Sequence, residues 1–199
     1  VASGQFGGQT ISISHLAPFV RDSENLIRQE VMDEMNENGI EITNTQLEAI
    51  VQKRLKKEIK DGIQTFQYQI NTLQTSNGQA PFLSVFMYPQ ENPEYVKETA
   101  MLIEEILRQR LKGMQNETGA WITPAFPKLL YVTDECNVYP GSEYFYLTEL
   151  AAKCIAHRMM PDCLSAKILR ENYEGNVFGP MGCRAFLSPY KGAINNKEG

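Results

Sequence analysis

Cys183 has the most unusual surroundings of any cysteine in this chain. It lies within residues 175–186, a stretch that also contains Gly179, Pro180 and Gly182. Glycine and proline interrupt regular secondary structure, so we expect the thiol to sit on a tight turn rather than inside a helix or strand. Glycines also allow a substrate to approach the sulfur closely. The alternative interpretation is that Cys183 is a small apolar filler, as many free cysteines are.

Four short segments that follow one another along the chain give this loop a context. They are residues 6–10 (FGGQT), 77–82 (NGQAPF), 123–129 (TPAFPKL) and 180–184 (PMGCR). In this order and spacing they resemble the middle of an anaerobic (class III) ribonucleoside-triphosphate reductase, which is a glycyl-radical enzyme. Residues 146–162 extend the resemblance, which covers about residues 4–190.

The resemblance implies a radical role for Cys183. In this family a glycyl radical takes a hydrogen atom from the cysteine of this loop. The resulting thiyl radical abstracts the 3′ hydrogen of the ribonucleotide, which activates loss of the 2′ hydroxyl. Gly182 would let the sulfur reach the sugar in a pocket that excludes water. Met181 lines the same pocket in relatives, and a core filler is the alternative interpretation of this side chain.

The resemblance also implies roles for two further segments, one in contacting the substrate and the other in sensing the effector nucleotide. Gly7 and Gly8 correspond to the glycine pair that approaches the substrate sugar, with Gln9 as a weaker companion. Residues 73–80 take the place of the loop that senses the effector nucleotide at the dimer interface and adjusts which base is accepted. A plain surface turn is the alternative interpretation of this loop. Its candidate residues are Thr75, Ser76, Asn77, Gly78 and Gln79.

The resemblance also implies partners and cofactors. The substrates would be ribonucleoside triphosphates, the effectors dNTPs and ATP, the activase a radical-SAM enzyme, and the reductant formate or a thiol protein. A homodimer is expected.

Several parts of such an enzyme are expected outside residues 1–199. The ATP-binding regulatory domain and a second active-site cysteine would precede Val1. The glycyl-radical glycine and the four-cysteine structural zinc site would follow Gly199. Both ends look like cuts through a longer polypeptide, because the chain begins without Met and ends in a polar tail. We therefore expect one fragment of the catalytic barrel domain, with a finger loop at about 175–186, no cofactor or metal of its own, and no activity alone.

Composition and charge narrow the class of protein further. A chain of 199 residues with 42% hydrophobic and 22% charged residues can form one soluble domain with a substantial core. Its net charge of −5 disfavours binding to a nucleic-acid backbone. No apolar run is long enough to span a membrane, and no signal pattern opens the chain. The four cysteines show no Cys-x-x-Cys pair and no zinc-type spacing, which favours a cytoplasmic protein.

Apolar periodicity predicts the elements that would position these residues. Strands are expected at 10–14, at 81–88 (buried on both faces) and within 121–132, and helices at 22–38, 45–73, 92–113, 142–160 and 165–171. Strands separated by helices predict an α/β fold. The family fold is a ten-stranded α/β barrel made of two half-barrels. The fold expected here is therefore a partial barrel, a half-barrel-type sheet with long helices.

The strongest periodic signal in the chain predicts the long helix at 45–73. Thr45 and Glu48 have the spacing of a capping box at its start. Its apolar positions are Leu47, Val51, Leu55, Ile59, Ile63, Phe66, Ile70 and Leu73, and its opposite face carries Lys53, Arg54, Lys56, Lys57 and Lys60. A solvated face explains the basic run. One small domain can hardly cover such a helix, so a subunit interface is a second interpretation.

Two other functions remain open from the residues. One is a non-catalytic α/β interaction module that uses the 45–73 helix and keeps Cys183 as a buried thiol. The other is a different glycyl-radical enzyme, such as a formate-lyase relative acting on a small acid. The cysteine that follows Met181 and Gly182, together with the GQAPF segment, favours the reductase. His15 and His157 show no metal-ligand spacing, and the chain has no Gly-Lys-Ser/Thr phosphate loop.

Overall fold

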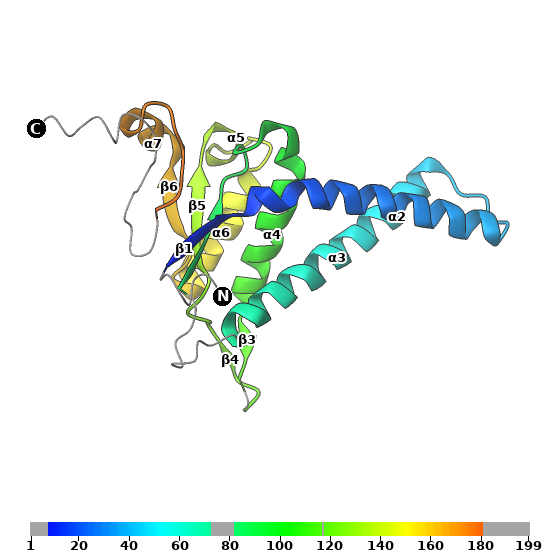
Figure 1. Cartoon of the computed structure of the whole chain (residues 1–199), viewed down its shortest axis with the longest axis horizontal. Coiled ribbons are helices and arrows are strands. Elements are labelled where there is room, and N and C mark those ends of the chain that lie inside the picture. The colour runs from blue at the N-terminus through cyan, green and yellow to red at the C-terminus, as the bar shows by residue number, and fades with distance from the viewer. Residues whose placement is uncertain (1–7, 73–81, 117, 181–199) are drawn as a thin grey trace, which may run out of the picture.

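A parallel β-sheet forms the centre of the computed structural model, which describes residues 8–72, 82–116 and 118–180. Its four strands lie in the order β1-β2-β5-β6 (Figure 1). Their bounds are Gln9–Ser12 for β1, Leu83–Met87 for β2, Lys128–Thr133 for β5 and Asp162–Ser165 for β6. Two shorter strands, β3 (Met114–Gln115) and β4 (Trp121–Ile122), pair as a separate antiparallel hairpin.

Helices connect successive strands of this sheet. Between β1 and β2 lie η1 (Ile13–Leu16), α2 (Ala17–Glu37) and α3 (Asn44–Thr72); between β2 and β5 lie η2 (Pro93–Tyr95) and α4 (Val96–Lys112); between β5 and β6 lie α5 (Glu135–Val138) and α6 (Phe145–Arg158); and α7 (Ala166–Asn172) follows β6. In Figure 1, α4 and α6 lie on one side of the sheet and α7 on the other, while the α2–α3 hairpin projects away. Parallel strands with helical connections confirm the α/β prediction.

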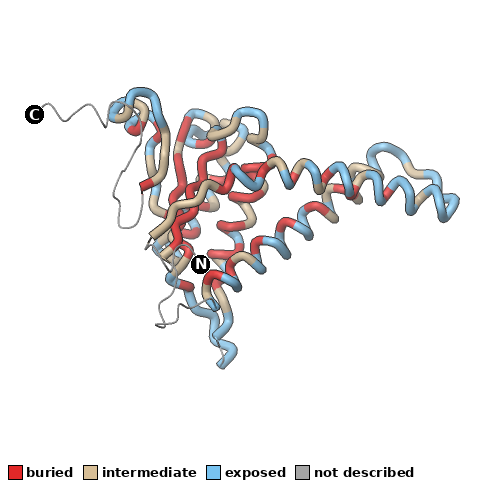
Figure 2. Tube along the Cα trace, viewed as in Figure 1, coloured by how far each residue is buried: buried red, intermediate tan, exposed pale blue. Residues whose placement is uncertain are grey.

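The central strands bury both faces of the sheet. Along β2, Val85 and Met87 belong to the main core with the helices, whereas Phe86 and Tyr88 belong to a second cluster on the opposite face. Strand β5 alternates in the same way, with Leu129 and Tyr131 against Leu130 and Val132. All five residues of β2 are buried, as predicted for this strand. Figure 2 shows the buried residues along these strands and the exposed outer end of the α2–α3 hairpin.

Helix α2 begins earlier than the sequence prediction, at Ala17 rather than Asp22. Proline is tolerated in the first turn of a helix, and Pro18 occupies that turn here. Ala17 and Val20 are buried against the core, so packing extends the helix toward its N-terminus. The predicted stop at Gly39 is confirmed, because this glycine has a φ of 63° directly after the C-cap.

Helix α3 is the predicted long helix, but its cap differs from the prediction. The reciprocal capping bonds join Thr43 and Gln46: the Gln46 N–H donates to Thr43 Oγ1 at 3.3 Å, and the Thr43 N–H donates to Gln46 Oε1 at 2.9 Å. The proposed Thr45–Glu48 box is therefore wrong, and Glu48 accepts instead from Arg28 at 2.6 Å. Most of the predicted apolar stripe is confirmed: Val51, Leu55, Ile59, Ile63 and Ile70 are buried, and Leu47 and Phe66 are partly buried against the core. Leu73 lies outside the described residues.

The second half of the chain matches most of the prediction. The two prolines of residues 121–132 separate β4 from β5, and α6 and α7 begin within about three residues of their expected starts. Strand β6 was not predicted, because its four residues (DCLS) carry too little apolar pattern. A ten-stranded barrel is not seen: the described residues form four parallel strands, with β1 and β6 at the two edges.

Candidate functional site

The site predicted from the sequence is only partly within the described residues. Gly8 and Gln9 lie at the start of β1. Gly7, Met181, Gly182, Cys183 and the effector-loop residues 75–79 lie outside the described ranges. The described part of the cysteine-bearing loop ends at Pro180, three positions before Cys183 in the sequence.

Residues 173–180, which we call the approach segment, return from the β6 edge of the sheet to the β1 edge. The segment follows α7, and Val177 packs against the second cluster, which contains Phe86 and Leu130. The end of the segment contacts β1 directly, because Thr10 Oγ1 donates a hydrogen bond to the Pro180 carbonyl oxygen at 2.6 Å. The structure thus brings β1, which begins at Gln9 directly after Gly8, next to the described end of the segment that leads to Cys183.

Gly179 fits this position because no side chain could. A Cβ atom built on Gly179 would lie 2.8 Å from Phe86 Cδ2 and 3.1 Å from Thr10 Cγ2. Phe86 belongs to β2 and is 2% exposed, so its ring cannot easily move aside. The approach segment therefore lies directly on β1 and β2, and the glycine is required by close approach rather than by a turn.

A partly buried polar cluster anchors α7, the helix that leads into the approach segment. Arg170 Nη1 donates to Asp134 Oδ1 at 3.1 Å, and Arg170 Nη2 donates to Tyr88 Oη at 2.7 Å. Tyr88 Oη in turn donates to Asp134 Oδ2 at 2.6 Å. Asp134 also caps α5 through the Glu135 N–H. These bonds tie α7 to the carboxyl ends of β2 and β5.

The charges of this cluster are stable at neutral pH. Burial opposes ionisation of Asp134, but the hydrogen bonds from Arg170 and Tyr88 outweigh it and lower the pKa of this carboxyl below its usual value. Burial and the bond to Asp134 raise the pKa of Tyr88, so the phenol stays neutral. The bond to Asp134 also raises the pKa of Arg170. The arrangement suits a structural anchor better than a proton-transfer site.

The surroundings of the three described cysteines differ from the tight turn expected for Cys183. Burial raises the pKa of Cys136 and of Cys154 to about 11 in each case. Cys154 is fully buried in the main core on the helix side of the sheet, whereas Cys163 is exposed on β6. None of the three is in the contact between β1 and the approach segment.

A second region, which the sequence analysis missed, surrounds Phe126 at the amino end of β5. Arg110 is fully buried, and its guanidinium donates to the carbonyls of Pro124, at 2.6 Å, and of Pro127. Burial lowers the pKa of Arg110 to about 10, which leaves it charged at neutral pH. A signal was present: position 110 follows Ile103 and Leu107 at helical spacing, so an arginine there had to be buried.

Phe126 connects this region to both flanks of the effector-loop candidate. Its carbonyl accepts from Asn71 Nδ2 at 3.1 Å, and its ring meets the Phe82 ring edge-to-face with centroids 5.0 Å apart. Asn71 lies just before residues 73–81 and Phe82 just after them. The TPAFPKL motif therefore contacts described residues on both sides of that segment.

Neither a metal cluster nor a membrane span is found in the part of the chain that the structure describes. No three side chains among His, Cys, Asp and Glu are placed to hold a metal ion there. His15 and His157 are both exposed, one in η1 and the other in α6. None of the described helices combines the length and apolarity needed to cross a bilayer.

Comparison with known proteins adds an independent result. A family model described as anaerobic ribonucleoside-triphosphate reductase matches residues 1–199. Proteins of the same name are similar to this chain: one from Enterobacteria phage T4 is 31% identical over 99% of the chain, and one from Escherichia coli (strain K12) is 34% identical over 96%. The Salmonella typhimurium protein is also 34% identical. The chain spans 31% of the length of the phage protein and 25% of each of these bacterial ones.

Proposed function

Because the chain belongs to the anaerobic ribonucleoside-triphosphate reductase family, we propose that it forms part of the catalytic domain of an enzyme that reduces ribonucleoside triphosphates to deoxyribonucleoside triphosphates. One structural observation supports this most: the Thr10–Pro180 hydrogen bond joins the strand of Gly8 and Gln9 to the loop of Cys183. Substrate-contacting and thiol-bearing segments must be adjacent for a hydrogen atom to pass between them.

In this proposal Cys183 is the residue that reacts with the substrate. A glycyl radical elsewhere in the full-length enzyme would supply the oxidising equivalent by taking the thiol hydrogen. Cys183 would then remove the 3′ hydrogen of the ribose, which re-forms its S–H bond and leaves the unpaired electron on the sugar. Gly7 and Gly8 would let the backbone approach the sugar, with Gln9 beside them. Met181 and Gly182 would line the pocket around the sulfur.

Regulation and reduction would involve groups beyond this site. We propose that residues 75–79 respond to dNTP or ATP effectors, that a radical-SAM activase generates the glycyl radical, and that formate or a thiol protein provides the electrons. A structural zinc site is expected in the full-length enzyme, but the described residues offer no ligand set for it. Residues 1–199 alone would be inactive.

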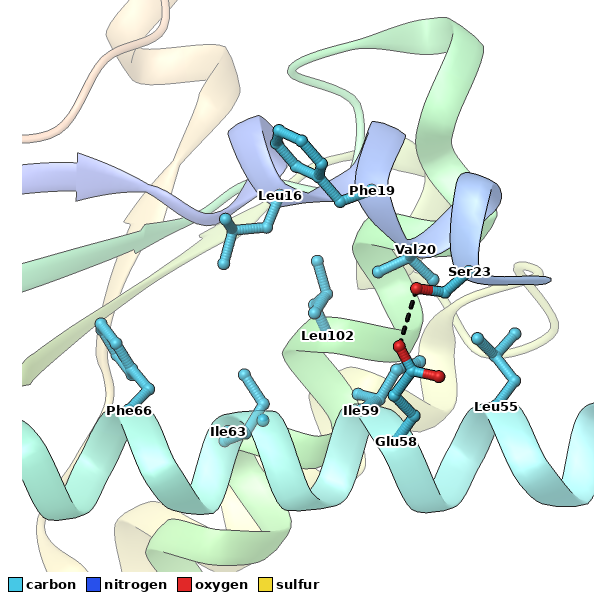
Figure 3. A pocket seen from close by; sticks show the side chains of 11 residues that line it. Leu16, Phe19, Val20, Ser23, Leu55, Glu58, Ile59, Ile63, Phe66 and Leu102 are labelled. Carbon is cyan, nitrogen blue, oxygen red and sulfur yellow. Dashed lines mark hydrogen bonds between the residues drawn. The ribbon is translucent and has the colours of Figure 1, made fainter. Parts of the chain in front are cut away.

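The α2–α3 hairpin is the proposed contact between two subunits. An apolar groove of about 270 Å³ lies between α2 and α3. Figure 3 shows the side chains that line it, including Leu102 of α4. Phe19 is 66% exposed and Leu16 is 42% exposed at its rim. Ser23 Oγ donates to Glu58 at 2.8 Å beside the groove. An exposed aromatic next to an apolar groove is typical of a protein interaction surface.

A cysteine substitution in the full-length enzyme tests the proposed chemistry. Cys183→Ser should form the glycyl radical, seen by EPR after anaerobic activation, but should make no deoxynucleotide. Cys163→Ser is the matched control, because Cys163 is exposed and lies away from the contact of β1 with the approach segment. It should retain wild-type turnover. If Cys183→Ser still produces deoxynucleotide, the assignment of chemistry to this loop is wrong.

A further inference from the structure

The Thr10–Pro180 hydrogen bond joins two segments that have different tasks in the proposed site. Thr10 directly follows Gln9 on β1, and Pro180 lies three positions before Cys183. The bond is short, at 2.6 Å between Thr10 Oγ1 and the Pro180 carbonyl oxygen, and it is partly buried. A change in this contact would therefore change the separation between β1 and the loop that carries the cysteine.

On the side that faces the sheet, the approach segment has no room to move closer to β1 and β2. Gly179 lies so close to Phe86 and Thr10 that a Cβ atom there would approach the Phe86 ring to 2.8 Å. Real Cβ atoms essentially never come this close to another heavy atom. The Thr10 methyl group limits approach from one direction, and the Thr10 hydroxyl holds the next carbonyl in place.

The approach segment is also held before it reaches β1. Arg170 on α7 binds Asp134 and Tyr88, and the rings of Tyr173 and Phe178 stack edge-to-face at 4.9 Å. Arg170 thereby ties α7 to the carboxyl ends of β2 and β5, the two central strands of the sheet. Val177 packs on the second cluster, and Gly179 and Pro180 then meet β1 and β2.

We infer that Thr10 is a positioning residue whose hydroxyl, by holding the Pro180 carbonyl, sets how closely Cys183 approaches a ribose bound at Gly8 and Gln9. The inference rests on the proposed function. Hydrogen abstraction needs the reacting atoms close to contact, and a misplacement of about 1 Å can cost about 100-fold in rate. Thr10 acts through the backbone of the loop and is not itself a catalytic residue.

The hydroxyl can be removed with little change of shape in the full-length enzyme. Thr10→Val leaves the Pro180 carbonyl without its donor, whereas Thr10→Ser keeps a hydroxyl at the same position. After anaerobic activation we expect the glycyl EPR signal of both variants to stay within about 2-fold of wild type. Turnover of Thr10→Val should fall about 10-fold or more, with KM changed by less than about 3-fold, while Thr10→Ser retains at least about a third of wild-type turnover.

An isotope effect separates positioning from general damage to the fold. If hydrogen abstraction becomes slower in Thr10→Val, the deuterium isotope effect with a 3′-deuterated ribonucleotide should exceed that of wild type. A second variant, Gly179→Ala, should show the same pattern because its methyl group pushes the loop off Phe86. Cys163→Ser, the control for Cys183→Ser, should behave as wild type in this assay too, because Cys163 is exposed on β6.

The results that overturn the inference differ from those that overturn the proposed function. If Cys183→Ser is inactive but Thr10→Val turns over like wild type, Thr10 does not position the loop. Equal losses in Thr10→Val and Thr10→Ser, an unchanged isotope effect, or loss of the glycyl signal in Thr10→Val also overturn it. Product formation by Cys183→Ser instead removes the proposed function itself.

Discussion

At the scale of residues, two buried charged side chains, Asp134 and Arg110, hold the segments around the proposed site. Asp134 accepts from Tyr88 and Arg170, and Arg110 donates to two carbonyls of the loop before β5. A buried ionic group that loses its partners costs more than the pair contributes when intact. Substitutions at these residues should therefore affect stability more than neighbouring surface changes do.

Asp134→Asn should destabilise the protein in a pH-dependent way. The pKa of Asp134 is lowered in the folded state, so its contribution is complete above the unfolded value of about 4 and is lost as pH falls through the lower folded pKa. We expect a loss of about 1–3 kcal/mol at pH 7, since Tyr88 and Arg170 lose a charged acceptor. Urea denaturation at pH 7 and pH 3 measures it. An equal loss at both values would contradict the role of the ionised carboxylate.

Arg110→Met should cost about 2–4 kcal/mol of unfolding free energy, because the carbonyls of Pro124 and Pro127 lose a buried donor. Arg108→Met is the control on the same helix. Arg108 has 59% of its side chain exposed and forms a salt bridge with Glu104 one helical turn away, so its loss should stay within about 0.5 kcal/mol. Denaturant melts of both variants compare them. Equal effects would show that Arg110 does not support the loop.

Helices and strands position the site at the scale of elements, and the α2–α3 hairpin stands apart from the rest. Its inner faces pack together through Val31, Val51 and Leu55, while the groove beside Phe19 stays open. An apolar groove at the base of a projecting hairpin suits contact with a second subunit. The residues that cover this groove in a dimer would exclude water from Phe19.

Phe19→Ser in the full-length enzyme should weaken the dimer at least about 10-fold, because a large aromatic near the centre of an interface often contributes more than 1 kcal/mol. Leu26→Ser is the control: Leu26 is also on α2 and 65% exposed, but it does not line the groove. Sedimentation velocity over a range of concentrations measures both dissociation constants. An unchanged constant for Phe19→Ser would place the interface elsewhere.

The sequence predicts the elements with strong periodicity and misses those that depend on tertiary contacts. The stripe from Val51 to Ile70 and the buried strand β2 have patterns that only one structure satisfies. Helix α2 extends to Ala17 because of packing on the core, which no local pattern reports. Strand β6 forms because β5 offers it an edge, not because DCLS favours a strand.

The candidate site shows the same division between local pattern and tertiary contact. The glycine at position 179 marked a special backbone position, yet its neighbours Phe86 and Thr10 are far away in the sequence. The sequence predicts Thr10 only as a strand residue. Its hydrogen bond to Pro180 joins residues that are 170 positions apart. The helical spacing of Arg110 after Ile103 and Leu107 indicated that it is buried, but not which carbonyls accept from it. Such contacts depend on how the sheet brings its strands together, and they become visible only in the folded chain.

At the scale of the whole molecule, the chain corresponds to one portion of its longer relatives. It spans 25–31% of the length of the relatives named above, and its four-stranded sheet has β1 and β6 as edges in the described residues. The approach segment covers one face of this sheet and leads to Cys183. We therefore propose that the thiol, β1 and the substrate ribose meet on this face.

The most direct test of that claim is a structure of the full-length enzyme, determined without oxygen and with a bound ribonucleoside triphosphate. The account predicts the Thr10–Pro180 hydrogen bond intact and the ribose beside Gly8. It also predicts Cys183 Sγ about 3–4 Å from C3′, the separation that hydrogen transfer requires. A ribonucleotide bound away from β1, or a Cys183 side chain packed in a core out of reach of the sugar, would contradict the account.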